Sequence, residues 1–345
     1  MAGKQAKRVL LLLCLLFGAL ALCACHSLGA AQVEDAPAPE AAQDGAASQT
    51  MPAETQKGAS SQSISEGDAS MAEDIQSEEP PKTVIDTDVF VQPDALLRKV
   101  EAPILGERIG KADLAATERQ WLAAVAPHHL VAGQYIAQVA AALAEQDPPL
   151  VIMLGPNHEN SGAPVQTTDA LWRTSVGDLA VDEAALEAVL ATGLVVENDA
   201  LFTTEHSIGT LMPFLAYYMP EVKVLPLAFH FGYSLEDAQK ILEALAPFLE
   251  EGAVLLGSID FSHGLQMAQA EERDAQTEAL LLAGDSQTIS HLRSQNLDAP
   301  TLLALLVEYA KEHGVEQPLI LANSNSGRLM QNTQMECTSY FTLLF

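Results

Sequence analysis

Apolar and polar positions alternate with two different periods along residues 83–345. Short, unbroken apolar runs predict buried strands, because a strand that is covered on both faces shows no polar alternation. Stretches with apolar residues three to four positions apart predict amphipathic helices between those strands. The predicted strands are 121–126, 150–154, 222–229, 253–259, 319–322 and 339–345. The predicted helices are 131–145, 235–249, 267–282 and 299–312.

Strands that alternate with helices are typical of an α/β sheet with helices on both faces. Pro127 ends the first apolar run, and Gly155-Pro156 ends the second, so that each chain segment is expected to turn sharply as it leaves the sheet. The sequence of this region shows no internal repeat and no linker. We therefore expect one α/β domain over residues 85–345.

The first 25 residues have the composition of an export signal. Three basic residues precede an apolar run over 9–22 that is too short for a stop-transfer helix. The segment ends in Leu22-Cys23-Ala24-Cys25, which resembles the bacterial lipobox that is cleaved before a lipidated cysteine. We therefore expect an extracytoplasmic lipoprotein that Cys25 anchors to the bacterial cell membrane. The alternative is an ordinary secretory peptide cleaved near residue 30, which also places the protein outside the cytoplasm.

Residues 26–84 have the composition of a flexible spacer. Between 26 and 82 there are 11 acidic and two basic residues among Ala, Ser, Gln, Pro and Gly, with almost no large apolar side chain. We expect a disordered, acidic linker that holds the folded domain away from an anionic membrane surface.

The net charge excludes one class of partner. The chain has 17 Lys and Arg residues against 46 Asp and Glu residues, which gives a formal charge of −29. A protein that binds nucleic acid needs a basic face to neutralise phosphate groups, and this chain cannot supply one. We therefore expect no nucleic acid partner, and we expect membrane contact only through the N-terminal lipid.

Cysteine placement predicts that the mature chain has no internal disulfide. Cys14 and Cys23 leave with the signal, and Cys25 is expected to carry the lipid. Cys337 then has no cysteine to pair with.

Three histidines follow predicted strands closely: His128, His158 and His263. The carboxyl ends of the strands are where ligand sites assemble in an open α/β sheet, so these imidazoles are expected at one edge. Imidazoles from separate loops suit a divalent first-row metal and leave positions open for a small-molecule substrate. The alternative for each residue is a loop histidine that is hydrogen-bonded to backbone. His230, His291 and His313 lack this context and are interpreted as surface or helix residues.

Five short motifs follow one another along the folded region. They are Pro127-His128, Gly155-Pro156-Asn157-His158, Glu205-His206-Ser207-Ile208, Leu211-Met212-Pro213-Phe214 and Asp260-Phe261-Ser262-His263. Their order and spacing resemble the Memo family, which in bacteria is called the AmmeMemoRadiSam system protein B group. The resemblance covers roughly residues 100–345.

The resemblance implies a three-layer α/β/α fold around a central mixed, mainly parallel sheet, similar to the class III extradiol dioxygenases. Those enzymes hold non-haem iron(II) with two histidines and a carboxylate, and use a further histidine as acid and base. By motif, His128 and His158 correspond to the two histidine metal ligands. His263, with Asp260 beside it, corresponds to the catalytic acid/base residue.

The third metal ligand is where this chain departs from the family. The resemblance implies that eukaryotic members of the family have a cysteine at this position, where this chain has Gly327. The alternatives are Cys337, Asp260, Glu159 or no third protein ligand. A carboxylate ligand suits iron(II) or manganese better than an all-nitrogen site does.

Glu205, His206 and Asn157 each permit two interpretations. Thr203 or its neighbour can cap a helix that runs through Leu215, which places Glu205 in the first turn where the helix dipole favours an anion. A protonated His206 at that position is unfavourable, because the helix dipole disfavours a cation at the N-terminus. Its side chain is therefore a candidate for ligand binding. Asn157 either binds substrate or closes a turn.

The sequence therefore predicts a membrane-anchored, metal-dependent redox or dioxygenase-like enzyme, with iron(II) favoured and the substrate unidentified. Zinc, copper or manganese is the alternative metal, because iron(II) is harder to keep reduced outside the cytoplasm. The alternative function is a non-catalytic lipoprotein that binds a metal or a small ligand. A serine hydrolase built on Ser262 is disfavoured, because the chain has no Gly-x-Ser-x-Gly elbow.

Overall fold

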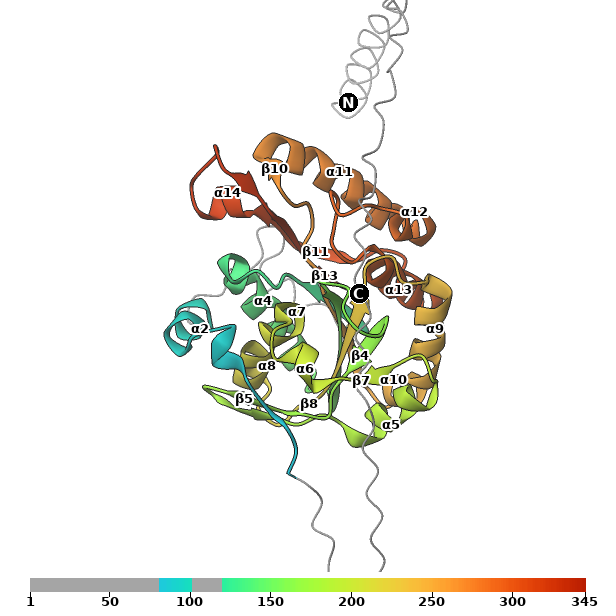
Figure 1. Ribbon diagram of the computed structural model, residues 1–345. Helices are drawn as coiled ribbons and strands as arrows, with labels where there is room; N and C mark the ends of the chain where they lie inside the picture. The colour runs from blue at the N-terminus through green and yellow to red at the C-terminus, as the bar shows by residue number, and fades with distance from the viewer. Residues whose placement is uncertain (1–80, 101–119) are drawn as a thin grey trace, which may run out of the picture. The chain divides into compact units, whose positions relative to one another are not determined.

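An eight-stranded sheet in the order β11-β13-β2-β9-β3-β8-β4-β7 forms the middle layer of the computed structural model (Figure 1). Its strands are β2 Ala123–Ala126, β3 Leu150–Asn157, β4 Val165–Thr167, β7 Val196–Glu197, β8 Lys223–His230, β9 Val254–Ser258, β11 Leu319–Asn325 and β13 Ser339–Leu344. Strands β2, β9, β3 and β8 are parallel neighbours, whereas β13 and β11 extend the sheet antiparallel at one edge. The mixed, mainly parallel sheet expected from the sequence is confirmed.

The structure describes residues 81–100 and 120–345. The predicted signal peptide with Cys25, and the predicted linker as far as residue 80, lie outside these residues. The described residues fall within one compact unit. Within 81–100 and 120–345, no helix has the length and apolar character needed to cross a membrane.

Helices cover the sheet on two sides, with α4, α7 and α8 on one side and α9 and α13 on the other (Figure 1). The α-helices are α2 Pro93–Val100, α4 Gly133–Ala144, α5 Glu183–Ala191, α6 Asp199–Phe202, α7 His206–Gly209, α8 Met212–Tyr218, α9 Leu235–Ala244, α10 Ala246–Glu250, α11 Met267–Ala283, α12 Ser286–Ser290, α13 Pro300–Glu312 and α14 Ser326–Leu329. Short 3-10 helices span Thr87–Val89 (η1) and Leu130–Ala132 (η2). The result is the three-layer α/β/α arrangement.

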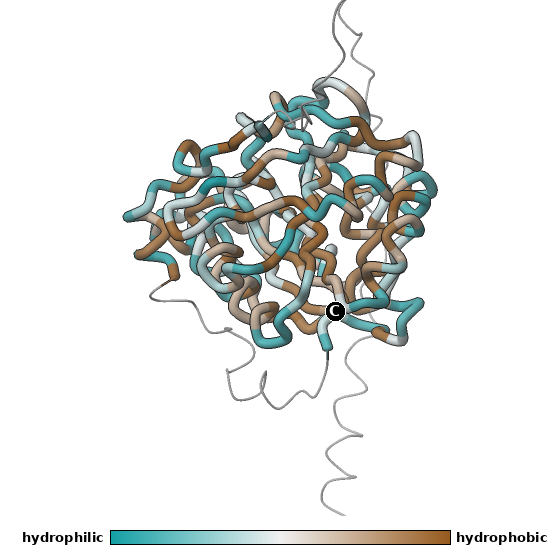
Figure 2. Tube along the Cα trace, turned by 90° about the horizontal axis from the view of Figure 1, so that it is seen from below, coloured by the Kyte–Doolittle hydropathy of each residue, from teal (hydrophilic) through white to brown (hydrophobic). Residues whose placement is uncertain are grey.

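The central strands consist mainly of apolar residues, because both faces of the sheet are covered. Every residue of β2, β3 and β9 is buried. Figure 2 shows hydrophobic segments concentrated in the interior of the trace and hydrophilic segments mainly along its outer loops. Burial of these strands stabilises the core and holds the carboxyl ends of β2, β9 and β3 next to one another.

Two small sheets attach peripheral segments to this core. One has the order β1-β5-β6, with β1 Val84–Asp86, β5 Leu171–Thr174 and β6 Gly177–Leu179. The other pairs β10 Leu265–Gln266 with β12 Glu336–Cys337. Because β1 pairs with β5 in parallel register, the segment that follows β1 has a defined position beside the main body.

The second predicted strand differs from the observed one at its end. Strand β3 continues through Gly155-Pro156 to Asn157, so these residues do not turn the chain out of the sheet as expected. Instead, Gly155 allows α7 to approach the strand. A Cβ atom at Gly155 would lie 2.8 Å from Oγ of Ser207 and 2.9 Å from Cδ1 of Ile208.

Two predicted helices are also divided in the structure. The helix expected over 235–249 is broken into α9 and α10, because Pro247 has no amide hydrogen to continue the helical ladder. The helix expected to run through Leu215 consists of α7 and α8. The predicted cap at Thr203 or Thr204, with Glu205 in the first turn, is wrong, since Glu205 itself is the N-cap residue of α7 and accepts a hydrogen bond from the amide of Ser207.

Candidate metal centre at the carboxyl edge of the sheet

The ends of three adjacent parallel strands bring the first site residues together. His128 follows β2, His158 follows β3, and Asp260 follows β9, which lies between the other two strands. The carboxyl ends of parallel strands point to the same edge of a sheet, which is where α/β proteins place ligands. The sequence therefore located this edge from strand ends alone.

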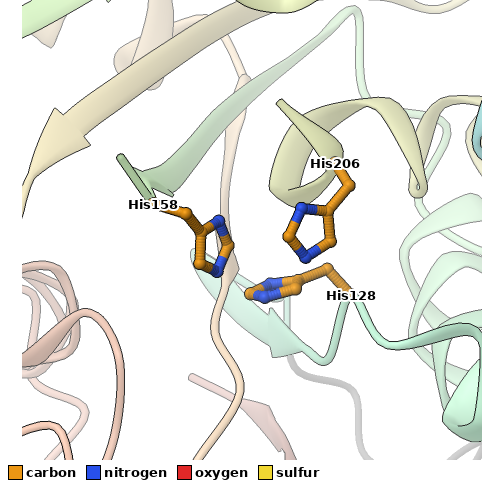
Figure 3. Close-up of side chains that lie close together, drawn as sticks. All are labelled: His128, His158 and His206. Atoms are coloured by element: carbon orange, nitrogen blue, oxygen red, sulfur yellow. The ribbon is translucent and has the colours of Figure 1, made fainter. Parts of the chain in front are cut away.

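His128, His158 and His206 form a compact group, with one ring nitrogen from each lying within 4.8 Å of the others (Figure 3). The ring centroids of His158 and His206 are 4.3 Å apart in a stacked arrangement. The ring of His128 meets the other two edge-on, at 5.1 and 5.2 Å. This group could hold a metal ion, since imidazole nitrogen is a common ligand of first-row metals.

Glu205 determines the orientation of His158. Its carboxylate oxygens accept hydrogen bonds from the backbone amide of His158 at 2.9 Å and from the amide of Ser207 at 2.8 Å. Oε1 also lies 2.8 Å from Nδ1 of His158, so Nδ1 is the nitrogen that carries hydrogen. Burial alone would raise the pKa of Glu205, but the hydrogen bonds from His158 and Ser207 lower it to about 2. The carboxylate is therefore ionised at neutral pH, and Nε2 of His158 is left for a ligand.

Ser258 selects the same tautomer in His128. Its hydroxyl donates to the carbonyl oxygen of Ser207, and its oxygen lies 3.1 Å from Nδ1 of His128. Since the hydroxyl hydrogen is already engaged, the serine oxygen accepts from Nδ1, and Nε2 faces the other site residues. The backbone amide of His128 donates to Oδ1 of Asp260 at 3.1 Å, which ties this loop to the end of β9.

Asp298 is a site residue that the sequence did not reveal. Its Oδ2 lies 3.2 Å from Nε2 of His128 and 3.9 Å from Nε2 of His158, and also accepts from the amide of Asp260 at 3.2 Å. Its Oδ1 is buried and has no hydrogen-bond partner among the residues that the structure describes. An aspartate two residues before Pro300 resembles a helix cap, and no sequence signal separates that role from a position facing the histidines.

Charges within the site are strongly coupled. Burial alone lowers the pKa of His128, but the carboxylates of Asp260 and Asp298 outweigh it and raise the pKa to about 9. A proton on His128 therefore competes with a cation for the same position between imidazole and carboxylate. Burial, together with the charges of His128 and His158, lowers the pKa of His206 to about 4, so that this ring is neutral at pH 7.

The three clustered histidines line an open pocket of about 500 Å³. The pocket is lined by Val89, Phe90, His128, His129, Leu130, His158, His206, Thr210, Asp260, His263 and Thr338. The structure thus places the predicted acid/base residues His263 and Asp260 on the pocket wall. His129 is a pocket residue that the sequence did not single out. Its Nδ1 atom lies 2.8 Å from the hydroxyl oxygen of Tyr340.

The other candidate residues lie elsewhere. The side-chain amide of Asn157 donates to the carbonyl of Ser161 at 2.8 Å, which closes the turn after β3, and Asn157 does not line the pocket. Cys337 is buried in β12, where its thiol donates to the carbonyl of Leu265. Glu159 is exposed and also does not line the pocket. Asp298 is therefore closer to a third-ligand position than either of these predicted alternatives.

Comparison with known proteins agrees with the resemblance seen in the motifs. The family described as Memo-like protein matches residues 97–343. A MEMO1 family protein of Pyrobaculum aerophilum is 28% identical over 235 residues, which cover 65% of this chain and 83% of that protein. A MEMO1 family protein of Methanosarcina acetivorans is 29% identical over 221 residues, which cover 61% and 80%. Another from Thermotoga maritima is 32% identical over 184 residues, which cover 49% and 65%.

Among solved structures, an uncharacterized protein of Escherichia coli K12 aligns with a TM-score of 0.44 at 13% identity, over 64% of this chain and 99% of that chain. The family match spans most of the chain and includes all three clustered histidines. This chain belongs to the Memo family.

Proposed function

We propose that this protein is a metalloprotein that binds a divalent first-row metal between His128, His158 and Asp298, beneath an open pocket for a small molecule. One observation carries the proposal. Separate hydrogen bonds leave the Nε2 atoms of both histidines facing the same carboxylate oxygen, at 3.2 and 3.9 Å. Once the metal has displaced the proton of His128, two imidazoles and one carboxylate suit iron(II) or manganese and leave coordination positions open.

The unpartnered oxygen of Asp298 is Oδ1, the second oxygen of the carboxylate whose Oδ2 faces the imidazoles. A buried carboxylate oxygen without a hydrogen bond is costly, and a cation beside it would offset that cost. The charge balance is favourable as well, since the carboxylate of Asp298 supplies the anionic ligand that imidazoles alone do not provide. These are the residues that would hold the metal.

We further propose a redox or dioxygenase-like reaction on a small molecule. When bound, the metal would supply Lewis acidity and, if it is iron, access to dioxygen chemistry. The role of His263 on the pocket wall is to move a proton to or from the substrate, and Asp260 beside it fixes the loop by accepting from the amide of His128. His206, neutral at pH 7 because burial and its neighbours lower its pKa to about 4, binds the ligand by accepting or donating a hydrogen bond.

A second function is favoured by the histidine group itself. His128, His158 and His206 together form an all-nitrogen site, which suits zinc or copper(II) rather than iron(II). In that arrangement the protein would bind a metal or a small ligand without turnover. The side chain of His206 is 51% exposed, so it can close on an ion that enters through the open pocket.

Metal analysis followed by an activity assay separates these functions. The full chain is loaded anaerobically in parallel with Fe(II), Mn(II), Zn(II) and Cu(II), and metal content is measured by mass spectrometry. His158→Ala is the test variant, and His291→Gln is the control, because His291 is exposed and bonds only within its own turn. Oxygen consumption against a panel of catechols then follows for each loaded protein.

Turnover that disappears in His158→Ala and persists in His291→Gln supports the enzyme. Stoichiometric metal without turnover supports the binding protein. If the parent retains no metal under any of the four conditions, the metal-site proposal is wrong.

We also propose that Cys25 anchors the protein outside the cytoplasm through lipid. Support comes from the Leu22–Cys25 motif and the basic and apolar residues before it. Expression of the full chain in a bacterium with labelled fatty acid tests this. Label should be incorporated by the parent and by Cys23→Ala, and should be lost in Cys25→Ala. Equal labelling of the parent and Cys25→Ala would exclude this anchor.

A further inference from the structure

The pocket that the histidines line contains two chemically different kinds of side chain. Histidines, Asp260 and two threonines are its polar members, whereas Val89, Phe90 and Leu130 are its three apolar members. Val89 is 68% exposed, the highest exposure among the large apolar side chains that the structure describes as exposed. Single exposed apolar residues are ordinary on a protein surface, but this one lines the same pocket as two other apolar side chains and the histidines. We refer to Val89, Phe90 and Leu130 as the apolar wall.

Hydrogen bonds hold the part of the apolar wall that contains Val89 and Phe90 in place. Strand β1 pairs with β5, and the hydroxyl of Thr87 donates to the carbonyl of Arg173 at 3.0 Å. Asp86 caps η1 by accepting from the amide of Asp88 at 3.0 Å. These bonds fix the turn that presents Val89 and Phe90, so its position does not depend on the ligand.

Phe90 couples this turn directly to the histidine group. Its ring lies so close to Gly209 that a Cβ atom there would come within 2.2 Å of it. Gly209 belongs to α7, the helix that begins with His206. The distance between the apolar wall and the histidines is therefore set by direct packing rather than by a long loop.

The charge of the pocket restricts the ligand further. Among the described residues that line it, none is Lys or Arg, and the polar members are histidine, aspartate and threonine. Recognition of phosphate or of a polyanion usually needs Arg or Lys, so this lining does not favour such a ligand. An apolar group and a compact metal-binding group match the two kinds of side chain.

From this geometry we infer that the ligand of the metal site is an amphipathic small molecule, with an oxygen-bearing head on the metal and a hydrocarbon group against the apolar wall. The inference rests on the proposed metal function and adds the class of ligand to it. Val89 and Phe90 are then specificity-determining residues that act on the hydrocarbon group and not on the metal. Their replacement should leave metal binding unchanged.

Two hydroxamates test this, because they share a metal-binding head and differ in the attached group. Acetohydroxamate and benzohydroxamate are titrated into the full chain loaded with whichever of the four metals it retains, and metal content is measured in each sample. The parent should bind benzohydroxamate about tenfold tighter, the gain expected when a phenyl ring is partly buried. In Val89→Ser that preference should fall to about twofold, with the affinity for acetohydroxamate unchanged.

Val84→Ser is the matched control, since Val84 is an exposed valine of the same segment that does not line the pocket. It should keep the full preference for benzohydroxamate. Phe90→Leu, which retains an apolar side chain over Gly209, should reduce the preference without loss of fold, as judged by the thermal unfolding midpoint.

The outcomes are distinguishable. Full metal content with equal affinity for both hydroxamates in the parent would overturn the apolar wall and leave the metal site standing. The same holds if Val89→Ser and Val84→Ser behave alike. Absence of metal in every preparation would remove the proposed function and this inference with it.

Discussion

Glu205 accepts a hydrogen bond from Nδ1 of His158 at 2.8 Å while it also caps helix α7. One buried carboxylate thus performs two tasks, because it begins the helix that carries His206 and orients the ring of His158. The exposed, equivalent-looking acid next to His158, Glu159, has neither contact among the described residues. The pair therefore links the segment that follows β3 to helix α7.

Replacement of Glu205 by glutamine should weaken metal binding by about tenfold to a hundredfold, because the carboxylate that fixes the tautomer of His158 is lost. A competition titration against a chelator measures the change. Glu159→Gln also removes one negative charge, next to His158 in the sequence, but Glu159 does not contact the ring of His158. This variant should keep its metal affinity within about twofold of the parent. Equal losses in the two variants would indicate a general charge effect instead of an orienting bond.

Asp298→Asn should change the metal preference as well as the affinity. The variant keeps the size of the side chain but removes its anionic charge, so Fe(II) and Mn(II), which favour carboxylate ligands, should lose at least about tenfold in affinity. Zinc and copper, which the three histidines can hold, should lose less. Parallel metal titrations measure both effects, with Asp237→Asn on the exposed face of α9 as control. A uniform loss for all four metals would contradict a ligand role.

Asp274 gives a prediction for pH dependence away from the metal centre. Burial raises the pKa of this carboxyl to about 6, although Ser339, Asn323 and Ser262 donate hydrogen bonds to it. Because the folded pKa lies above the unfolded value near 3.8, the folded state binds more protons between these two pH values. Stability should therefore fall as pH rises from about 4 to about 6, by roughly 3 kcal/mol in total.

Urea unfolding of the parent and of Asp274→Asn at pH 4, 5, 6 and 7 measures this contribution. The amide does not titrate, so the difference in unfolding free energy should shift in favour of the variant as pH rises, and then level off above pH 6 to 7. A difference that stays constant across these four pH values would show that Asp274 titrates normally.

Gly209→Ala should destabilise the protein by about 1 to 3 kcal/mol, since the new methyl group would meet the ring of Phe90 at 2.2 Å. The smaller side chain in Phe90→Leu should relieve part of this strain. Thermal unfolding of the two single variants and the double variant gives the coupling energy directly. Strictly additive effects would mean that the ring and the glycine do not contact one another in solution.

The strand ends were predictable because buried parallel strands leave a strong local signal. Apolar runs predicted β2, β3 and β9, and the histidines that follow two of them are indeed at one edge of the sheet. The path of the chain after β3 was less predictable. Gly155-Pro156 has the composition of a turn, yet close packing of Ser207 and Ile208 of α7 against it keeps this pair within the strand.

Contacts between distant segments were beyond local patterns. Asp298 lies 170 residues along the chain from His128, and its own neighbours predict only a helix start. The second role of Glu205 was hidden in the same way, because a helix N-terminus is sufficient reason for an acidic residue there. In both cases a local role was enough to explain the acidic residue, and its histidine partner lay on another element.

By itself the sequence determined the family, the α/β class and the buried strands, since each depends on short-range pattern or on motif order. It also singled out all three clustered histidines, two as metal ligands and His206 as a ligand-binding candidate. Only the tertiary structure decided the rest. It brought His206 to His128 and His158, aimed Asp298 at their Nε2 atoms, and placed Val89 and Phe90 in the pocket that they line. The physical reason is that a strand end specifies an edge of the sheet, whereas a site requires loops from several elements to pack at distances that only the folded core fixes.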